Sequence, residues 1–498
     1  MILVHRLTAS LLASLAFLLT LVGSPARSAH AGTYDWESSP NYQFRMWIDD
    51  DMPVVYGFYV VFNESVGDTR DLVTRDRYIE WARSMGFGTI GTRFEAPGDT
   101  DEDTMQSATL ITALENFAAM SGHPEVANAP LLVDGLSLGG HNSVKFAALY
   151  PERTIGYMGG AAGRLPLEAV DNPAFDQVPG IVYFGELDTD IDDALARRDD
   201  FIPLRRDGAR VSFFVQWTFE HERGNASRMG WKILSDMVSL RYPIDQNPTA
   251  GPVDLIDIPL ESGWVANYDT WDGPLTAIQP YADAEEPEEQ FWLPTRDSAF
   301  VYRAHATRET PLSFVEPPSD PENPSYPSVQ PGDVVPIELS VGNLSSVSMV
   351  EVFDGSEPIA QLTAAPYQTS WTAAGIGMHA LVAVATLADG SRHTGWSAPV
   401  MVLGSAHPGG GTIGDDGGGD DTGADDGTGD TGDDGGDGDD GDDGDDGDNG
   451  ADGGGGSGGD GGCGCHTGDS TGGAGQLGLG LVAAAALLAL RRRGSRRS

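Results

Sequence analysis

The chain has 498 residues, which is too many for one compact domain, so we expect two or three domains. Its 75 acidic residues outnumber its 29 lysines and arginines, and the net charge of −46 argues against nucleic acid as a partner because phosphates would be repelled. Only Cys463 and Cys465 could form a disulfide, and both lie outside any segment that could fold. The folded domains therefore depend on their apolar cores.

Residues 1–31 are typical of a secretory signal peptide. A weakly basic start precedes an apolar run at 11–22, and Ala29-His30-Ala31 has the small-x-small pattern of a signal peptidase site. The apolar run is shorter than the ~20 residues that a membrane span needs. We therefore expect cleavage before Gly32 and export of the chain.

Residues 32–242 alternate between apolar runs and segments of helical periodicity. Polar and aromatic residues 34–51 lead into the first strands. We expect further strands at 54–62, 87–94, 130–133, 154–160, 180–184 and 211–219, and helices at 75–85, 107–120, 142–149, 193–206 and 229–240. This alternation predicts an α/β domain with an open, mostly parallel sheet and helices on both faces. In such sheets the active site lies beyond the carboxyl ends of the strands.

The segment Gly135-Leu136-Ser137-Leu138-Gly139 follows one of these strands and precedes a helix. A serine in Gly-x-Ser-x-Gly at a sharp strand-to-helix turn has a protruding hydroxyl, and the flanking glycines let the strand and helix pass closely. The motif alone arises by chance in glycine-rich sequences. Its position between a strand and a helix favours Ser137 as a nucleophile.

A serine nucleophile needs a base, and the base needs an acid that fixes its tautomer. The strand at 180–184 is followed by Gly185-Glu186-Leu187-Asp188, which places Asp188 in the loop at the required edge, with Glu186, Asp190 and Asp192 as alternatives. His221 follows the last strand and precedes the closing helix.

Two other histidines fit the role of the base less well. His141 lies on the first turn of the helix behind Ser137 and points in the wrong direction, so we expect it to pack or to support the site. His123 falls in a loop before the serine strand. Along the chain the three candidates follow in the order Ser137, Asp188, His221.

Residues 34–242 resemble the α/β-hydrolase family, especially secreted esterases and polyester depolymerase-like members, and residues 135–140 carry the resemblance. It implies an oxyanion hole made of two backbone amides. One is that of Leu138, and the other comes from the loop after the third strand. Here that loop reads Asn63-Glu64-Ser65 where many members have His-Gly-x, and the register assigns the second amide to Ser65.

The substrate expected for such a site is a carboxylic ester, small or polymeric. Only 17 residues, 163–179, separate two late strands, which is too few for a large helical lid, so we expect an open cleft. The resemblance implies no metal and no organic cofactor. A serine peptidase is an alternative, but it usually comes with a lid or propeller domain. A surface adhesion protein that uses a hydrolase scaffold is a further alternative.

Two further regions follow the α/β domain. Residues 243–328 are rich in proline and aromatic residues, and we interpret them as a small accessory β-lobe or an extended wrapping segment. Its aromatic side chains would pack on the hydrolase, with a stacking platform for sugars or aromatic polymers as the alternative. Residues 329–403 contain short alternating strands at 335–341, 348–353, 358–363, 368–372, 380–385 and 398–403. They predict an immunoglobulin-type β-sandwich and resemble the Ig-like domains of secreted bacterial enzymes, which act mostly as spacers.

Two segments close the chain. Residues 404–462 hold 19 aspartates and no lysine or arginine, which predicts a disordered, charge-extended stalk. Residues 463–498 combine Cys463 and Cys465 with an apolar run and a terminal arginine cluster. This order resembles the sorting tails of myxobacterial surface proteins and implies processing and anchoring at Cys463 and Cys465. A metal site at the two cysteines and His466 is the competing interpretation.

Overall fold

The computed structural model describes residues 32–49, 51–65, 67–95, 100–162, 172–189, 197–318 and 326–409. The predicted signal peptide, the stalk beyond residue 409 and the sorting tail with Cys463 and Cys465 lie outside these residues. All described residues belong to one unit, Met1–Gly418. Within the described ranges, every helix is too short or too polar to cross a membrane.

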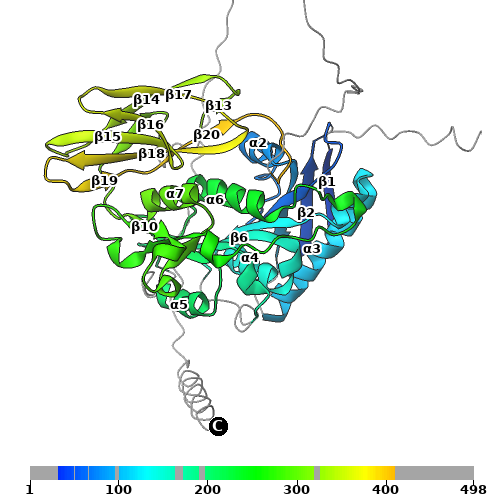
Figure 1. Ribbon diagram of the computed structural model, residues 1–498. Helices are drawn as coiled ribbons and strands as arrows, with labels where there is room; N and C mark the ends of the chain where they lie inside the picture. Colours follow the sequence, from blue (N-terminus) through cyan, green and yellow to red (C-terminus); the bar gives the residue numbers. More distant parts are fainter. Residues whose placement is uncertain are drawn as a thin grey trace, which may run out of the picture. The chain divides into compact units, whose positions relative to one another are not determined.

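An eight-stranded sheet forms the centre of the molecule (Figure 1), with the order β1-β2-β4-β3-β5-β6-β7-β8. Its strands are β1 (Gly32–Ser39), β2 (Tyr42–Ile48), β3 (Gly57–Phe62), β4 (Phe87–Phe94), β5 (Leu131–Leu136), β6 (Thr154–Gly160), β7 (Gly180–Gly185) and β8 (Val211–Gln216). Strand β2 runs antiparallel to β1 and β4, and β3 to β8 are parallel. This confirms the predicted α/β sheet.

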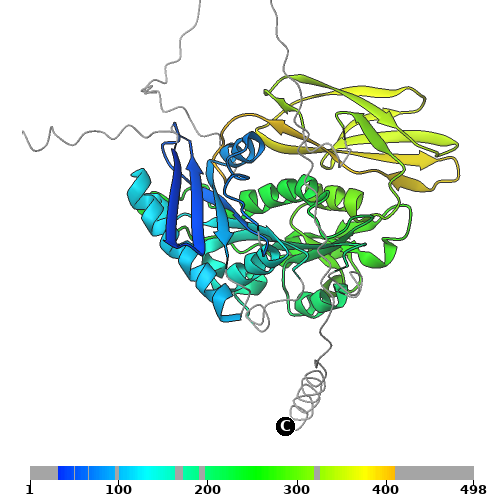
Figure 2. The same cartoon turned by 180° about the vertical axis from the view of Figure 1, so that it is seen from behind.

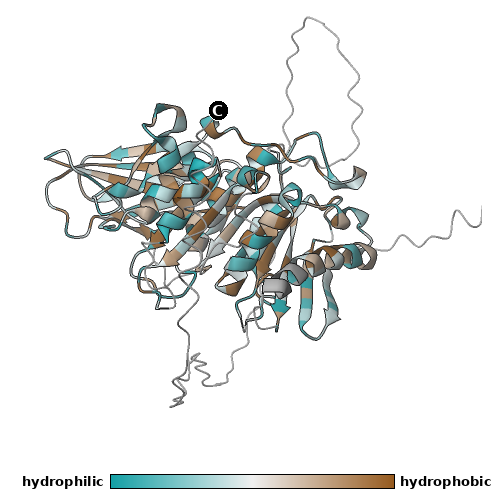
Figure 3. Cartoon of the chain, turned by 90° about the horizontal axis from the view of Figure 1, so that it is seen from below, coloured by the Kyte–Doolittle hydropathy of each residue, from teal (hydrophilic) through white to brown (hydrophobic). Residues whose placement is uncertain are grey.

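The parallel strands are buried because helices cover both faces of the sheet. The helices are α2 (Asp76–Ser84), α3 (Thr100–Ser121), α4 (Leu138–Leu149), α5 (Arg198–Arg206) and α6 (Ala226–Arg241). Helices α3, α4 and α5 lie on one face, and α2 and α6 lie on the other (Figures 1 and 2). Strands β3, β5, β6, β7 and β8 are buried over their whole length, which explains their continuous apolar runs. Apolar residues accordingly concentrate on the central strands (Figure 3).

Helix α4 begins four residues earlier than the sequence predicted, directly after Ser137. The glycines there allow close packing, because a Cβ atom built on Gly140 would lie 2.2 Å from the carbonyl oxygen of Gly160 on β6. The start of the helix therefore presses directly against the sheet.

The segment after α6 adds a small sheet and an unpredicted helix. Strands β9 (Trp264–Asn267), β10 (Ala277–Pro280) and β11 (Phe291–Leu293) pair in the order β10-β9-β11. Trp271 and Phe291 are buried and contact the ring of Phe213 on β8. These two aromatics thus pack on the α/β sheet. Helix α7 (Arg296–Ala306) is capped by Thr295, whose hydroxyl accepts a hydrogen bond from the amide of Ser298.

Two further sheets share a second apolar core. One has the order β12-β14-β17 and the other β13-β20-β18-β15-β16, with β19 paired to β18. Their strands are β12 (Ser313–Glu316), β13 (Ser328–Val329), β14 (Val334–Ser340), β15 (Val347–Asp354), β16 (Glu357–Leu362), β17 (Tyr367–Thr372), β18 (Gly377–Leu387), β19 (Arg392–Thr394) and β20 (Ala398–Val402). Ile337 and Trp371 from the first sheet meet Val352 and Ala383 from the second. The immunoglobulin type stays a prediction.

These two sheets begin earlier than predicted and contact the α/β part extensively. Strand β12, from the segment expected to be accessory, pairs with β14, so this region starts before residue 329. Met378 and Ala380 of β18 belong to the apolar core of the α/β part. The hydroxyl of Ser356 also donates to Asp297 of α7 at 2.6 Å. The region expected to act as a spacer is therefore packed against the α/β part.

Candidate active site

Ser137 occupies a strained turn between β5 and α4. Its φ of 58° and ψ of −123° are unfavourable for a residue with a side chain. The turn is held because the Ser137 amide donates to the Gly160 carbonyl at 2.8 Å. Glycine is required on both sides, since a Cβ atom on Gly135 would lie 2.1 Å from the Gly139 backbone and one on Gly139 would lie 2.5 Å from the Phe62 carbonyl oxygen. This is the geometry expected of a nucleophile at a strand-to-helix turn.

Asp188 and His221 meet at the ends of β7 and β8. His221 Nδ1 lies 2.8 Å from Asp188 Oδ2. The Asp188 side chain has no exposed surface, whereas a quarter of the His221 side chain is exposed. An ionised carboxylate only accepts hydrogen bonds, so the pair places the proton on Nδ1 and leaves Nε2 able to accept one.

The backbone around this pair fixes the two loops against each other. The amide of Leu187 donates to the carbonyl of Phe219 at 2.8 Å. A Cβ atom on Gly185 would lie 2.1 Å from the carbonyl oxygen of Glu220, next to His221. Only a glycine at the end of β7 permits this approach. Ser137, Asp188 and His221 all follow the carboxyl ends of parallel strands and so lie at the same edge of the sheet.

The other candidate side chains have different partners. Glu186 accepts from the Thr218 amide at 3.1 Å and from Arg308 at 2.6 Å, so it is held away from His221. His123 Nδ1 lies 2.9 Å from Glu125. His141 is on the first turn of α4, where its amide donates to the Ser137 carbonyl at 3.0 Å. Asp190 and Asp192 lie outside the described residues.

An ion pair that the sequence analysis missed, with its aspartate buried and its arginine one-fifth exposed, lies beside the site. Arg223, two residues after His221, lies 2.6 Å from Oδ2 of Asp134, three residues before Ser137. The hydroxyl of Tyr59 also donates to this oxygen. Burial alone would lower the pKa of Arg223, but the charge of Asp134 outweighs it, and the pKa is raised well above its usual value. The pair therefore ties the His221 loop to the Ser137 strand in its charged form.

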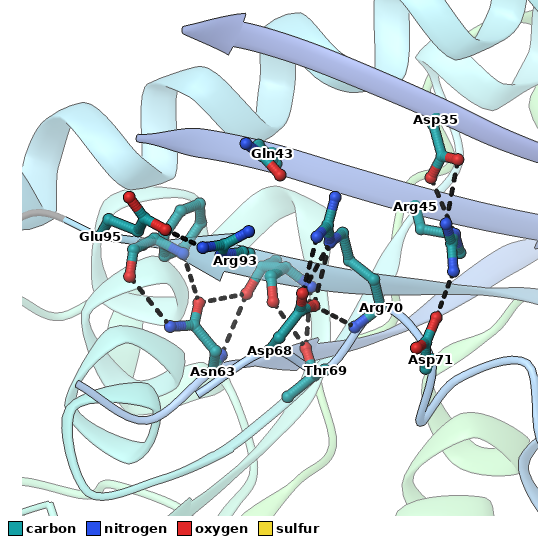
Figure 4. A network of polar contacts seen from close by, with 12 residues as sticks. Asp35, Gln43, Arg45, Asn63, Asp68, Thr69, Arg70, Asp71, Arg93 and Glu95 are labelled. Carbon is teal, nitrogen blue, oxygen red and sulfur yellow. Dashed lines mark hydrogen bonds and ion pairs between the residues drawn. The ribbon is translucent and has the colours of Figure 1, made fainter. Parts of the chain in front are cut away.

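The loop after β3 is anchored by Asn63 (Figure 4). Its buried side chain accepts from the Phe94 amide at 2.9 Å and from the Thr92 hydroxyl at 2.9 Å, and its amide group donates to the Phe94 carbonyl at 3.2 Å. Glu64 and Ser65, which follow, are exposed. Asn63 thus fastens the start of the loop after β3 to the end of β4.

The backbone offers one amide that suits an oxyanion site. Leu138 is the first residue of α4, and the first amides of a helix have no partner within it. The helix dipole also favours negative charge at this end. Across the described ranges, no group of three His, Cys, Asp or Glu side chains is placed to hold a metal ion.

No family model and no curated protein matches the chain in sequence. Among solved structures, poly(aspartic acid) hydrolase-1 from Sphingomonas sp. KT-1 is similar at 14% identity over 42% of this chain and 99% of that one, with a TM-score of 0.32. An acetyl xylan esterase from Aspergillus awamori matches at 13% identity over 40% and 98%, with a TM-score of 0.31. The fibronectin(III)-like modules of Clostridium thermocellum CbhA match at 30% identity over 18% and 93%, with a TM-score of 0.16.

Proposed function

We propose that this chain is a serine hydrolase that cleaves carboxylic esters through an acyl-enzyme. The observation that carries the proposal is the joint placement of a strained serine and a histidine–carboxylate pair at one edge of a parallel sheet. Ser137 has a positive φ between β5 and α4, and Asp188 lies 2.8 Å from His221 after β7 and β8. A structural serine or histidine would need neither the strain nor the buried carboxylate.

In the proposed mechanism, Nε2 of His221 takes the proton from the Ser137 hydroxyl as its oxygen attacks the ester carbonyl. The Asp188 carboxylate holds the Nδ1 proton and stabilises the imidazolium that forms. His221 then gives its proton to the leaving alcohol, and an acyl group stays on Ser137. His221 then takes a proton from water, and the water oxygen attacks the acyl group. The acid is released as His221 returns the proton to the Ser137 oxygen.

The charge that develops on the carbonyl oxygen would be stabilised by backbone amides. The Leu138 amide at the start of α4 is the first donor, and we assign the second to Ser65 in the loop held by Asn63. Removing one such donor typically slows catalysis about 100- to 1,000-fold. Proline is the one residue without a backbone N–H, so Ser65→Pro deletes this donor and should lower kcat by about that factor. Ser65→Ala keeps the amide and should leave kcat nearly unchanged.

We further propose that the enzyme is exported through residues 1–31 and anchored at the cell surface through residues 463–498. The support is the order of the two sequence signals and the acidic stalk between them. Mass spectrometry of the mature protein tests this directly: its first residue should be Gly32, and Cys463 or Cys465 should be the site of processing. A chain that keeps Met1 at its start would contradict the export proposal.

Labelling with a fluorophosphonate tests the serine chemistry. The wild-type protein should be labelled on Ser137, and Ser137→Ala should lose the label together with esterase activity. Ser348→Ala removes an exposed hydroxyl on β15 and serves as the matched control. An unlabelled wild-type protein would overturn the proposal. A panel of acyl esters, polyesters and peptides then separates an esterase from a peptidase.

A further inference from the structure

A pocket of about 560 Å³ is lined by residues of the two loops that carry the proposed oxyanion donor and His221. Glu64, in the loop assigned to the oxyanion site, lines it on one side. Arg223 and Gly224, which directly follow the His221 loop, line it on another. Tyr326 and the β-sandwich residues Met378 and Pro399 complete the wall. The pocket is therefore continuous with the elements that carry the site.

The polar part of the pocket is dominated by arginine. Four arginines contribute to its lining, Arg75, Arg77, Arg223 and Arg228. This is unusual for a chain in which acidic residues outnumber basic ones by 75 to 29. A cluster of guanidinium groups in a concave site favours a carboxylate or another anion, which it can bind through two hydrogen bonds at once.

Two of these arginines keep their donors available. Among the described residues, no ion pair or side-chain hydrogen bond involves the guanidinium of Arg75 or Arg77. The Nε atom of Arg77 is buried without a hydrogen-bond partner. A buried donor of this kind is unfavourable until a ligand satisfies it. Arg75 is also the N-cap of α2, with no side-chain cap, so the first amides of that helix add to the positive potential.

Two carboxylates that line the pocket pair with arginines outside it (Figure 4). Asp68 is bound by Arg70, with 2.6 Å between Oδ2 and Nη2, and Asp71 shares Arg45 with Asp35. Asp134, behind the pocket, pairs with Arg223. Glu64 is the remaining acidic side chain, and it is exposed. With four arginines against three acidic residues in its lining, the pocket carries a net positive charge.

The remaining wall is apolar and aromatic. Phe62, Tyr78, Trp231, Tyr326 and Met378 contribute to it. Trp231 and Tyr78 contact each other edge to face, with ring centroids 5.1 Å apart, and Tyr326 contacts Trp231 at 6.0 Å. Such a wall suits a short hydrocarbon chain between the ester and the anion.

We propose that the pocket binds an anionic group of the substrate, so that the preferred ester carries a carboxylate separated from the ester bond by a short apolar chain. This inference rests on the proposed function, because it assigns the substrate class of the same site. The carboxylate could belong to the acyl part or to the alcohol part of the ester. The chemistry of recognition is the same in both cases.

Two matched pairs of esters test the proposal and distinguish the two sources. For the acyl part, mono-para-nitrophenyl adipate is compared with para-nitrophenyl hexanoate, which has the same chain length without the charge. For the alcohol part, para-butyryloxybenzoate is compared with methyl para-butyryloxybenzoate, in which a methyl ester removes the charge of the carboxylate. In at least one pair, kcat/KM should favour the charged ester about tenfold or more, and the preference should shrink as salt is added.

Substitutions at Arg77 connect the preference to the pocket. Arg77→Met keeps an unbranched, flexible stem and removes the charge, and Arg77→Gln is a second variant in case the first folds poorly. Each should reduce the charged-to-neutral ratio of kcat/KM about tenfold. Arg83→Met is the matched control, because Arg83 lies on the same helix and pairs with Asp49 at 2.5 Å, away from the pocket. It should leave the ratio unchanged.

The outcomes separate this inference from the proposed function. Turnover of the neutral esters with no charge preference in either pair would overturn the anion site and leave the hydrolase proposal standing. Absence of both turnover and fluorophosphonate labelling would overturn the hydrolase proposal. In that case calorimetry of adipate binding to the Ser137→Ala protein decides the anion site: binding that Arg77→Met abolishes supports it, and no binding overturns it.

Discussion

Two histidine–aspartate pairs in this molecule have the same geometry but different surroundings. His221 Nδ1 lies 2.8 Å from Asp188 in the α/β part, and His379 Nδ1 lies 2.8 Å from Asp354 in the β-sandwich. The first pair lies at the sheet edge that carries the strained Ser137. The second faces Trp371, whose ring centroid is 5.0 Å from that of His379. The hydrogen bond alone therefore does not indicate a catalytic site, and the proposed function depends on the serine turn.

The largest expected effect comes from removing the carboxylate of each pair in turn. Asp188→Asn should lower kcat about 10,000-fold, because the amide no longer fixes the tautomer of His221 or stabilises its charged form. Asp354→Asn, the matched change in the β-sandwich, should leave ester hydrolysis unchanged. Steady-state kinetics on a neutral ester measures both. Similar losses in the two variants would contradict the assignment of the site.

The next effect concerns the Asp134–Arg223 pair, which joins the loop of the first histidine pair to the Ser137 strand. Asp134→Asn leaves the Arg223 charge buried without its partner and should cost about 3–5 kcal/mol of unfolding free energy. Asp35→Asn is the control, because Asp35 also pairs with an arginine but is more than half exposed, and it should cost at most about 1 kcal/mol. Denaturant unfolding measures both, and equal costs would show that the buried pair has no special role.

A third histidine, His305, has an uncharged hydroxyl as its partner in place of an aspartate. It is buried beside the Ser397 hydroxyl at 2.8 Å, and its desolvation, followed by the charge of Arg228, lowers its pKa to about 3. Between about pH 6.5 and 3 the unfolded chain binds a proton at this residue and the folded chain does not. His305 should therefore reduce stability as the pH falls through this window, by about 1.4 kcal/mol per pH unit.

The contribution of His305 is measured as the difference between the wild type and His305→Gln over this pH window. Other groups act alike in both proteins, including Asp176, whose pKa is raised to about 6 mainly by burial. As the pH falls from 6.5, the unfolding free energy of the wild type should decrease relative to that of His305→Gln. A difference that is constant from pH 6.5 to 4 would contradict the buried neutral state of His305.

The smallest effect is expected at Glu186, the alternative acid of the sequence analysis. Its carboxylate is held by Arg308 and the Thr218 amide on the partly exposed side of the loop. Glu186→Gln should change kcat less than about threefold and stability by less than about 1 kcal/mol. A loss comparable to that of Asp188→Asn would move the role of the acid to Glu186.

The sequence predicted those parts of the fold that leave a local pattern. Strands that are covered on both faces read as continuous apolar runs, so β4 and β6 agree with their predicted bounds. Helix α7 and strand β12 were missed, because their mixed polar and aromatic residues show no clear period and become stable only through tertiary contacts. The Tyr302 hydroxyl of α7, for example, donates to the Phe213 carbonyl on β8.

Within the site, the sequence predicted the residues that have a local signature and missed those that have none. Asp188 and His221 follow strand ends, which the sequence shows. Asp134 lies inside a buried apolar strand and Arg223 lies in a polar loop, and nothing local connects them across 89 positions. The arginine-lined pocket is likewise a product of the tertiary fold, because its walls come from five separate stretches of the chain.

The shared core of the α/β part and the β-sandwich limits how this protein can be divided or recombined. Met378, Ala380, Val382 and Met401 are buried in the same apolar cluster as the central sheet. A truncation after α7 would expose that cluster to water and remove one wall of the pocket, so a shortened enzyme should aggregate. Exchanging these two sheets for those of another protein would also replace Met378 and Pro399 in the pocket wall, so the two regions must vary together during evolution or engineering.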